Sequence, residues 1–438
     1  MAPQVDRFDG NAAPPLRTSV VVIGGGIAGV STTLFLAERG VPVVLCEKGI
    51  IAGEQSSRNW GWTRVMGRDE REIPLGLESL KLWRRMNELT GAETGFRECG
   101  IAYLCDSERE IAEYEAWQEK ARPFQIHTQL LRGGEVERVL PGAAKPFVGA
   151  LYNPGDGRAE PTKAAVAMAK AAEARGAVVL TGCAVRGIET KGGRISGVIT
   201  EKGPIACESV VLAGGAWSRL FAGNAGIDLP QLKILGSVFR TAPLEGAPEV
   251  SGGSNNFGFR KRLDGGYTIA RRNASISVIT PDSFRLFRDF APSLVKSWRE
   301  LRLRVGRQFL TEWHTPRRWR MDEETPFEKV RILDPEPSHG LIEEAKRNLG
   351  SAFPAFHKMR EVERWGGLID VTPDAVPVIS AVDAIPGFFM ATGFSGHGFG
   401  IGPGAGKLMA DIVIGATPAV DATPYRLSRF DRSQGKAA

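Results

Sequence analysis

Apolar residues in the first part of the chain alternate between short strand-like runs and helix-like patterns. Residues 20–23 are four consecutive β-branched residues, which is typical of a parallel strand buried on both faces. Apolar positions with helical spacing follow at 30–38, and a second apolar run at 41–45 predicts a neighbouring strand. Residues 18–47 are therefore predicted to form a β-turn-α-β unit.

The same alternation continues toward the end of the chain and predicts an α/β protein. Helices are predicted at residues 70–92, 107–121, 160–176 and 407–414, and strands at 96–104, 177–180, 209–212 and 387–392. Two β pairs are predicted at 185–200 and 256–272, the second around the turn Asp264-Gly265-Gly266. Residues 1–17 show no periodic pattern and are expected to form a flexible leader.

The turn inside the first unit has the spacing Gly24-x-Gly26-x-x-Gly29, and the second strand ends near Glu47. Gly24 allows a tight turn, Gly26 lets backbone N–H groups approach a pyrophosphate, and Gly29 lets the helix pack closely on the strand. The positive end of the helix attracts phosphate, and a carboxylate at Glu47 accepts hydrogen bonds from ribose hydroxyls. This spacing predicts a dinucleotide site, and the alternative is a structural glycine turn without a ligand.

A polar loop at residues 51–62 follows the second strand, at the edge of the sheet where ligands of such folds bind. Within it, Ser56, Ser57 and Arg58 are expected to donate hydrogen bonds to phosphate oxygens. The alternative is a surface loop that buries its two tryptophans.

Two further predicted strands end in glycine-rich turns. The strand at 209–212 leads into Ala213-Gly214-Gly215, whose small residues allow the backbone to come close to a ligand. The strand at 387–392 leads into a glycine-rich loop at 393–406 and then a helix. The backbone N–H groups of that loop are expected to face an anionic or electron-accepting group.

Composition and charge exclude several classes of function. The chain has 438 residues, of which 42% are hydrophobic, and its net charge is only +6, which argues against nucleic-acid binding. The five cysteines are scattered and never at metal-ligand spacing, so buried thiols in a reducing compartment and no metal are expected. Residues 1–17 lack the apolar core of a signal peptide, and no run approaches the roughly 18 apolar residues of a membrane span. A cytoplasmic protein is therefore expected.

Residues 283–320 combine aromatic residues with arginines at rough helical spacing. A basic amphipathic helix of this kind can lie on an anionic membrane. The alternative is a helix that packs on its own domain and exposes a basic face to water.

Four motifs together resemble the D-amino-acid oxidase superfamily of flavin amine oxidoreductases. They are Gly24-x-Gly26-x-x-Gly29 with Glu47, the string at 212–218, Thr372-Pro373-Asp374 with Pro377, and Gly396-His397-Gly398-Phe399-Gly400. Longer strings, among them 51–58 and 217–221, are similar to the Proteus-type bacterial L-amino acid deaminases and their soluble oxidase relatives. The resemblance implies a glutathione-reductase-type FAD-binding Rossmann domain and an α+β substrate domain with a mixed or antiparallel sheet.

The resemblance also divides the chain. The FAD-binding domain is expected at residues 18–95, 151–228 and 365–430, and the substrate domain at 96–150 and 229–364. The residues expected to bind FAD are Gly24, Gly26, Ile27, Ala28, Gly29, Glu47, Lys48, Gln55, Ser56, Ser57, Arg58, Asn59, Trp60, Gly61, Val185, Ala213, Gly214, Gly215, Trp217, Gly366, Asp374, Gly396, His397, Gly398, Phe399 and Gly400.

The activity implied by the resemblance is oxidative deamination of an L-α-amino acid to a 2-oxo acid and ammonia. The α-hydrogen is expected to leave as hydride toward flavin N5, and positioning and desolvation supply much of the rate. Because the membrane helix of the Proteus-type enzymes is missing, reoxidation by O₂ to hydrogen peroxide is expected, with another electron acceptor left open. No cysteine lies near residues 365–410, so FAD is expected to be non-covalent, and a homodimer is expected.

Arg272 is the expected catalytic and substrate-binding residue, because the match over 259–272 aligns it with the carboxylate-binding arginine of the deaminases. An arginine fork suits a carboxylate, and Arg271 is the local rival. The expected walls of the side-chain pocket are Trp62, Phe394 and Trp365. A D-amino acid dehydrogenase, or an oxidase of N-substituted amino acids such as sarcosine or opines, is the alternative.

Overall fold

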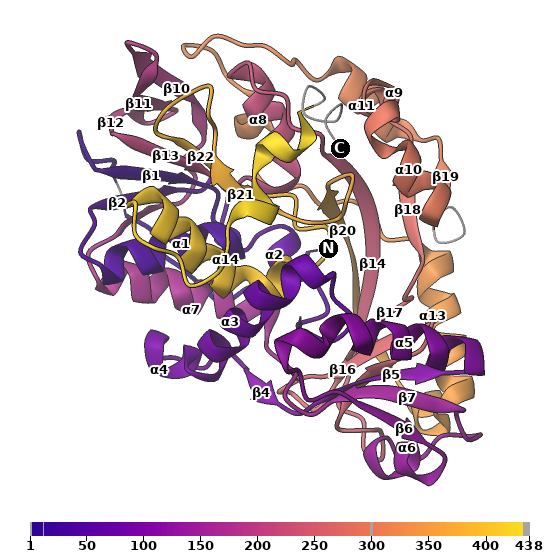
Figure 1. The fold of residues 1–438 in the computed structure, drawn as a ribbon. Coiled ribbons are helices and arrows are strands. Elements are labelled where there is room, and N and C mark those ends of the chain that lie inside the picture. Colours follow the sequence, from indigo (N-terminus) through magenta and orange to yellow (C-terminus); the bar gives the residue numbers. More distant parts are fainter. Residues whose placement is uncertain (1, 12, 298–300, 432–438) are drawn as a thin grey trace.

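The computed structural model describes residues 2–11, 13–297 and 301–431. A six-stranded sheet on the left of Figure 1 has the order β21-β22-β13-β1-β2-β9. Its strands are β1 Val20–Ile23, β2 Val43–Cys46, β9 Val178–Leu180, β13 Ser209–Leu212, β21 Val378–Ala381 and β22 Phe388–Thr392. All neighbours in this sheet are parallel except β21 and β22, which are antiparallel. The predicted β-turn-α-β unit is confirmed.

Alternate residues of the buried strands face two different layers. Val20 and Val22 pack with one set of helices, and Val21 and Ile23 pack in a separate core cluster on the other face. The helices are α1 Ile27–Glu38, α3 Ile73–Arg84, α7 Pro161–Ala174 and α14 Gly398–Val413. The opposite face is covered by a small sheet of β10 Val185–Lys191, β11 Arg194–Thr200 and β12 Gly203–Ala206. This three-layer arrangement is the one expected for a glutathione-reductase-type FAD fold.

The C-terminal helix begins nine residues earlier than predicted, at Gly398 instead of Lys407. It has glycines at its interface with α1 and α3, where a side chain would not fit. A Cβ on Gly406 would lie 2.3 Å from the Cβ of Ser31, and one on Gly402 would lie 2.6 Å from a carbon of Ile27. The glycine-rich segment is therefore a close helix–helix contact over much of its length, where a loop was expected.

A ten-stranded sheet extends down the right side of Figure 1 and has the order β19-β18-β14-β17-β16-β15-β5-β7-β6, with β20 also paired to β14. Its strands are β5 Ile101–Cys105, β6 Gln129–Arg132, β7 Gly149–Asn153, β14 Leu232–Thr241, β15 Ser251–Gly253, β16 Gly258–Lys261, β17 Tyr267–Ala270, β18 Ser275–Val278, β19 Leu301–Arg304 and β20 Glu361–Val371. Helix α13, His339–Ala352, packs its apolar face on β14 and β17. The predicted mixed sheet and the hairpin at 256–272 are confirmed.

The remaining elements lie outside the two large sheets, and most of them are short. They are α2 Gln55–Arg58, β3 Trp62–Thr63, α4 Met86–Thr90, β4 Arg97–Glu98, α5 Glu108–Ala121, α6 Gly134–Val139, β8 Gly157–Arg158, α8 Ser218–Asn224, α9 Pro281–Arg285, α10 Phe287–Ser297, α11 Arg307–His314 and α12 Pro326–Lys329. The helix predicted at 70–92 is interrupted at Arg85, between α3 and α4. Strand β20 belongs to the ten-stranded sheet up to Val371, and the next strand, β21, belongs to the six-stranded sheet. The division into five domain segments remains a prediction.

The N-terminal segment is not a flexible leader where the structure describes it. Asn11 exchanges two hydrogen bonds with Val179, an edge residue of the six-stranded sheet. The N–H of Asp6 donates to the carbonyl of Thr162, and Arg17 forms a β-bridge with Ala206. These hydrogen bonds, most of them between backbone groups, hold the segment on the surface. They require no periodic pattern of apolar residues, so the sequence did not indicate them.

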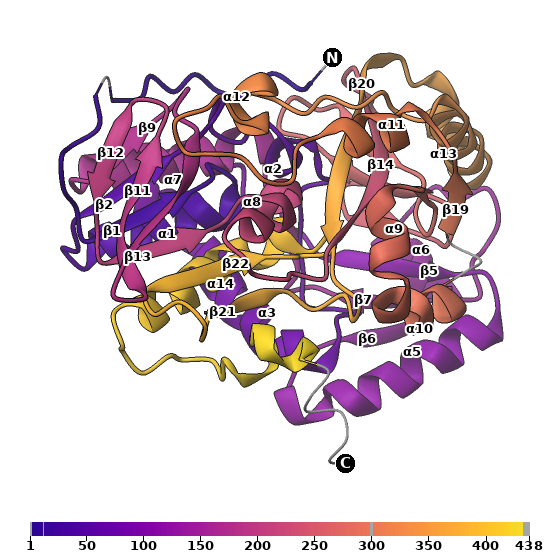
Figure 2. The same ribbon diagram turned by 90° about the horizontal axis from the view of Figure 1, so that it is seen from above.

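Helices α9, α10 and α11 and strand β19 lie together at the right-hand edge in both Figure 1 and Figure 2. This stretch is the predicted basic segment, of which residues 298–300 lie outside the described residues. Its exposed large apolar side chains are Phe284, Phe287, Val295, Leu303, Val305, Leu310 and Trp313. The stretch therefore exposes an apolar face as well as arginines. Among the described residues, no helix is both long and apolar enough to cross a bilayer.

Candidate active site

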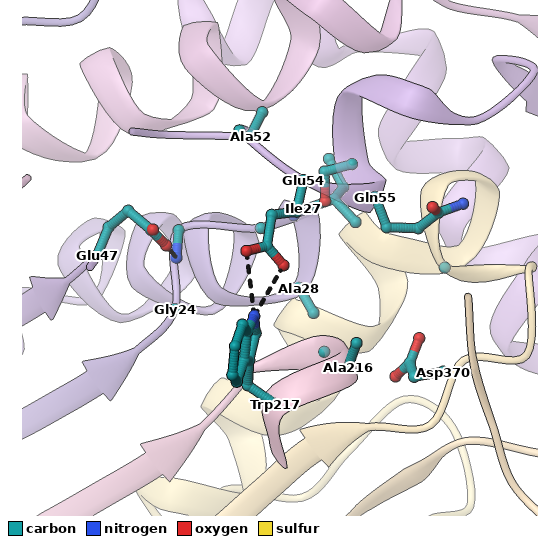
Figure 3. Close-up of a pocket in the computed structure, with 18 of the residues that line it drawn as sticks. Gly24, Ile27, Ala28, Glu47, Ala52, Glu54, Gln55, Ala216, Trp217 and Asp370 are labelled. Atoms are coloured by element: carbon teal, nitrogen blue, oxygen red, sulfur yellow. Dashed lines mark hydrogen bonds between the residues drawn. The ribbon is translucent and has the colours of Figure 1, made fainter. Parts of the chain in front are cut away.

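The first cavity runs along the carboxyl ends of β1, β2 and β13, where three glycine-bearing turns meet (Figure 3). Most of the residues predicted to bind the cofactor line it. They are Gly24, Gly26, Ile27, Ala28, Glu47, Lys48, Gln55, Ser56, Asn59, Val185, Ala213, Gly214, Gly215, Trp217, Gly396, Gly398 and Phe399. The structure thus brings together segments that are more than 370 residues apart. We call this space the nucleotide cavity.

The first glycine turn is shaped by backbone contacts. Gly24 has φ +111°, which disfavours a side chain, and a Cβ on it would lie 2.5 Å from the carbonyl oxygen of Ala213. Gly29 does not line the cavity, because its α-carbon packs against the carbonyl of Gly24, where a Cβ would lie 1.9 Å away. Ser56 accepts a hydrogen bond from the N–H of Ile27 at 2.8 Å and so fixes the loop at the start of α1.

Glu47 ends the second strand at one end of the nucleotide cavity. Its carboxylate accepts hydrogen bonds from the N–H groups of Gly25 and Gly49, at 2.6 and 2.7 Å. Burial raises the pKa of Glu47, and Lys48 and these N–H groups oppose the rise. A ribose whose hydroxyls donate to this carboxylate would add further stabilisation to its charged form.

Glu54 and Trp217 form a contact across the nucleotide cavity that the sequence did not indicate. The indole N–H of Trp217 lies 3.1 Å from both carboxylate oxygens of Glu54, shown by dashed lines in Figure 3. Glu54 also accepts from Lys48 Nζ at 2.6 Å and from the N–H of Leu333 at 3.0 Å. This network ties the loop after β2 to the turn after β13.

Asp370 is a second lining residue that sequence reasoning missed (Figure 3). The N–H of Gly393 donates to its carboxylate at 2.7 Å, and Gln231 and Thr392 donate at 3.3 Å. Burial raises the pKa of Asp370 to about 6, against the lowering effect of these donors. Its position, one residue before the end of β20, belongs to no motif that would mark it as a site residue.

A second cavity, of about 390 Å³, adjoins the first and opens toward the ten-stranded sheet. Gln55, Asn59, Gly396 and Phe399 line both cavities and form the junction between them. The side-chain oxygen of Gln55 is buried there without a hydrogen-bond partner. A ligand in the nucleotide cavity that reaches the junction would therefore present one end to the second cavity, which we call the arginine cavity.

Arg272, the predicted carboxylate ligand, lines the arginine cavity. Its guanidinium carbon lies 3.8 Å from the centre of the Tyr103 ring, a cation–π contact that restrains the side chain. Burial raises the pKa of the neighbouring Tyr114, and Arg272 opposes the rise. The rival Arg271 also lines the cavity, but its Nη1 donates to the carbonyl of Asn255 at 2.6 Å and its Nε lies 3.5 Å from Glu344.

Two further arginines in the loop after β3 face the same space. Arg64 lies with its guanidinium 5.6 Å from the Tyr103 ring centre, and Arg68 is buried with Nε donating to the carbonyl of Arg64 at 3.0 Å. Of the described residues that line the arginine cavity, none is an aspartate or a glutamate. The cavity is therefore strongly positive.

His397 lines the arginine cavity at the start of α14 and has a carboxylate partner. Its Nδ1 lies 3.1 Å from Oε2 of Glu72, which is fully buried. Burial lowers the pKa of His397, Glu72 opposes the fall, and Arg68 and Arg64 add to it. An imidazole with a lowered pKa is neutral at pH 7.

Several predicted residues lie elsewhere. Arg58 was expected to bind phosphate, but its guanidinium is buried and donates to Asp334 and to the carbonyl of Gly366, both at 2.8 Å. Asp374 lines neither cavity, because it binds Arg71 and Arg429. Gly366 lies against the carbonyl of Pro335. None of these three residues lines the nucleotide cavity, whereas Arg58 does contribute to the lining of the arginine cavity.

The remaining predicted residues divide between the cavities. Trp60, Gly61, Trp62 and Gly400 line the arginine cavity, and Phe394 lines the nucleotide cavity. Trp365 and Ser57 line a third, polar cavity beside the N-terminal segment, so Trp365 is not a wall of the arginine cavity. The indole of Trp365 donates to the carbonyl of Arg58 at 2.9 Å, which explains its burial.

The lining fits a dinucleotide whose redox-active end lies at the junction. The open turn at Gly215, the turn at Gly26 and the N-terminus of α1 suit a pyrophosphate, and Glu47 suits a ribose. The buried oxygen of Gln55 and the N-terminus of α14 then flank the other end. No metal cluster is present among the described residues.

Comparisons with known proteins agree with this geometry. The family model described as FAD dependent oxidoreductase (DAO) matches residues 19–412. The structure of L-amino acid deaminase from Proteus myxofaciens in complex with anthranilate is 36% identical to the chain, with a TM-score of 0.94 over 98% of this chain and 97% of that one. L-amino acid deaminase from Proteus vulgaris is 31% identical, with a TM-score of 0.92 over 97% of this chain and 100% of that one.

Curated relatives are more distant and have other activities. The 4-methylaminobutanoate oxidase (formaldehyde-forming) of Paenarthrobacter nicotinovorans is 26% identical over 98% of this chain, which spans 48% of that protein's length. Sarcosine oxidase subunit beta of Rhodobacter capsulatus is 24% identical over 96% of this chain and 90% of its own length.

Proposed function

The chain belongs to the DAO family of FAD-dependent oxidoreductases, and from this premise we propose that it oxidises L-α-amino acids to 2-oxo acids and ammonia. The observation that carries the proposal is the junction at Gln55 and Gly396, where the nucleotide cavity meets a cavity that contains Arg272. The likeness to the two Proteus deaminases over nearly the whole of each chain supports the L-amino acid substrate.

Arg272 binds the substrate carboxylate in this proposal. The cation–π contact with Tyr103 already restrains the Arg272 side chain, so less entropy is lost when the carboxylate binds. Gln55 contributes a buried acceptor for the substrate amine or the cofactor at the junction. The aromatic walls at Trp62 and Phe399 exclude water from the reacting carbon.

The chemistry that FAD supplies when bound is acceptance of a hydride from the substrate's α-carbon. The resulting imino acid then reacts with water to give the 2-oxo acid and ammonia. The residues of the chain orient the substrate. His397 beside the junction has a lowered pKa and so adds no positive charge near the reacting α-carbon.

We propose O₂ as the electron acceptor, with hydrogen peroxide as product, and non-covalent FAD. Among the described residues that line the two cavities, the only cysteine is Cys46, which ends β2 next to Glu47 and does not line the junction. The exposed apolar face between Phe284 and Trp313 keeps a membrane-bound acceptor as the competing possibility. The cytoplasmic location and the homodimer remain predictions.

Oxidation of N-substituted amino acids is the second candidate. It is favoured by the sarcosine oxidase beta subunit, which aligns over 96% of this chain. Such substrates also carry a carboxylate, so Arg272 serves either reaction and does not distinguish them.

The test is anaerobic mixing of the purified yellow protein with L-amino acids, D-amino acids and sarcosine. Bleaching of the flavin by L-isomers, with release of ammonium and a 2-oxo acid, is the expected result. Bleaching by D-isomers alone, or by sarcosine with release of formaldehyde, would replace the proposal with an alternative. Peroxide formed on admitting air identifies O₂ as acceptor.

A further inference from the structure

The arginine cavity contains more positive charge than one carboxylate needs. Arg64, Arg68 and Arg272 face it, and neither Arg64 nor Arg68 forms an ion pair with a described residue. An α-amino acid with a neutral side chain brings one carboxylate, for which Arg272 suffices. The two arginines of the loop after β3 then have no anion inside the cavity, although the buried carboxylates of Glu72 and Asp156 interact with both of them electrostatically.

Arg68 is the side chain that most clearly lacks a hydrogen-bond partner for one of its donors. It is 3% exposed, and its Nη1 is buried without a hydrogen-bond partner. Burial lowers the pKa of Arg68 to about 10, and Arg64 adds to the fall, while Glu72 and Asp156 oppose it. A buried guanidinium with an unused donor is costly unless a ligand supplies the acceptor.

We propose that Arg68, assisted by Arg64, binds a second carboxylate on the substrate side chain, so that the enzyme acts on acidic L-amino acids. This inference rests on the proposed function, because it assigns the α-carboxylate to Arg272. Arg64 and Arg272 both lie close to the Tyr103 ring, with their guanidinium carbons 5.6 and 3.8 Å from its centre.

The walls between the arginines suit the methylene groups of such a substrate. Trp62 lies with its ring centre 5.9 Å from that of Tyr103, and Trp60 packs edge-on against Trp62 at 5.0 Å. These rings give an apolar surface between two positive groups. A fully apolar side chain would fit the rings but would seal Arg68 away from water without an acceptor.

Two other roles for Arg68 make different predictions. If it only stabilises charge on the reduced cofactor, its loss will slow every substrate equally. This role is considered because Arg68 lies close to the start of α14, where a Cβ on Gly400 would be 3.2 Å from Arg68 Nη2. If Arg68 is only structural, its loss will lower the melting temperature without changing the ranking of substrates.

The experiment compares L-aspartate, L-glutamate and L-2-aminoadipate with L-asparagine, L-glutamine and L-norleucine by anaerobic flavin reduction. We expect the wild-type enzyme to have a higher kcat/KM for at least one acidic substrate than for its neutral counterpart, by about 10- to 100-fold. Arg68→Gln is expected to remove that difference in kcat/KM between each acidic substrate and its neutral counterpart.

A readout without turnover separates this inference from the proposed function. Glutarate, which has two carboxylates and no amine, is expected to perturb the flavin absorbance of the holoenzyme at lower concentration than butyrate. Arg68→Gln is expected to abolish this preference, and Arg68→Lys to retain part of it. Arg85→Gln, at a side chain that is 64% exposed on the surface, is the matched control.

The outcomes are distinct. Preference for glutarate without oxidation of any amino acid would support the second carboxylate site and refute the proposed activity. Oxidation of neutral L-amino acids with no preference for glutarate, or equal slowing of all substrates by Arg68→Gln, would overturn the inference and leave the activity standing. Binding of glutarate that survives Arg68→Gln would also overturn it.

Discussion

His397 Nδ1 lies 3.1 Å from the buried Oε2 of Glu72, although 325 positions separate the two residues in the chain. The contact joins the start of α14 to the short turn that precedes α3, and it faces the arginine cavity. The carboxylate is the group that opposes the lowering of the His397 pKa by burial, Arg68 and Arg64. Burial is the largest of these effects, and Glu72 makes the imidazole easier to protonate than it would be without the carboxylate.

Replacement of Glu72 by Gln is expected to lower the pKa of His397 further, because the remaining effects all disfavour the charged ring. The measurement is the NMR titration of the His397 Cε1–H signal, assigned by its loss in His397→Asn. An unchanged midpoint would show that the carboxylate has no electrostatic effect on the ring. The same titration of His314, an exposed residue, is the control.

Replacement of Arg272 by Ala is expected to raise KM for amino acids by about 10- to 100-fold while FAD stays bound, because a charged hydrogen bond to the carboxylate is lost. Steady-state kinetics and the flavin absorbance of the purified variant measure the two effects. Arg271→Ala decides between the neighbours. A larger rise in KM for Arg271→Ala than for Arg272→Ala would transfer the assignment to Arg271.

Replacement of Glu47 by Gln is expected to weaken FAD binding by about 10- to 100-fold, since Gln cannot accept hydrogen bonds at both side-chain atoms from Gly25, Gly49 and a ribose. Fluorescence titration of the apoprotein with FAD gives the dissociation constant. The rise in melting temperature on adding FAD should shrink in parallel. Glu208→Gln, at an exposed carboxylate, should bind FAD as the wild type does.

Replacement of Gly406 by Ala is expected to destabilise the protein by about 1 to 3 kcal/mol through overpacking between α14 and α1. The new Cβ would lie 2.3 Å from that of Ser31, and this clash outweighs the better helix propensity of Ala. Thermal unfolding measures the change. Gly134→Ala, where a Cβ meets nothing within 4 Å, is expected to be neutral or stabilising, and equal effects at both sites would contradict the packing account.

Asp156 should make the stability depend on pH. Burial raises its pKa from the ordinary 3.8 to about 7, so between about pH 4 and pH 7 the folded state binds a proton that the unfolded state has released. The free energy of unfolding therefore falls as the pH rises through this window and is constant above it. Relative to the wild type, Asp156→Asn is expected to be more stable at pH 8 than at pH 5.

Thermal unfolding at both pH values measures this difference. Asn cannot accept both backbone N–H groups, of Val65 and Met66, that Asp156 accepts, so the variant's stability is lower by a constant amount at each pH. Only the change with pH tests the raised pKa. Asp9→Asn, at an exposed carboxylate, should show no such change, and parallel curves for Asp156→Asn would refute the prediction.

The strands of the six-stranded sheet were predictable because buried parallel strands need uninterrupted apolar runs. The start of α14 was not, since glycine and Pro403 usually interrupt helices. Here the packing against α1 requires residues without side chains, so tertiary contacts override the local preference. The glycines of this segment indicate a close helix–helix contact only when the partner helix, α1, is known.

The nucleotide cavity was predictable from its glycine turns, but several charged residues were assigned the wrong partners. Arg58 and Asp374 lie in motifs that look suited to a ligand, yet each is bound by residues distant in sequence, such as Asp334 and Arg429. Arg68 was missed because a single arginine in a polar loop carries no local signal. Its importance depends on burial, which the three-dimensional structure alone reveals.

The nucleotide cavity draws its lining from Ile23 at one extreme to Phe399 at the other. Limited proteolysis will therefore not yield a small fragment that retains the yellow colour, because a cut at any loop between those residues divides the lining between two pieces. The cofactor instead links distant parts of the chain, and its presence should slow digestion throughout the molecule.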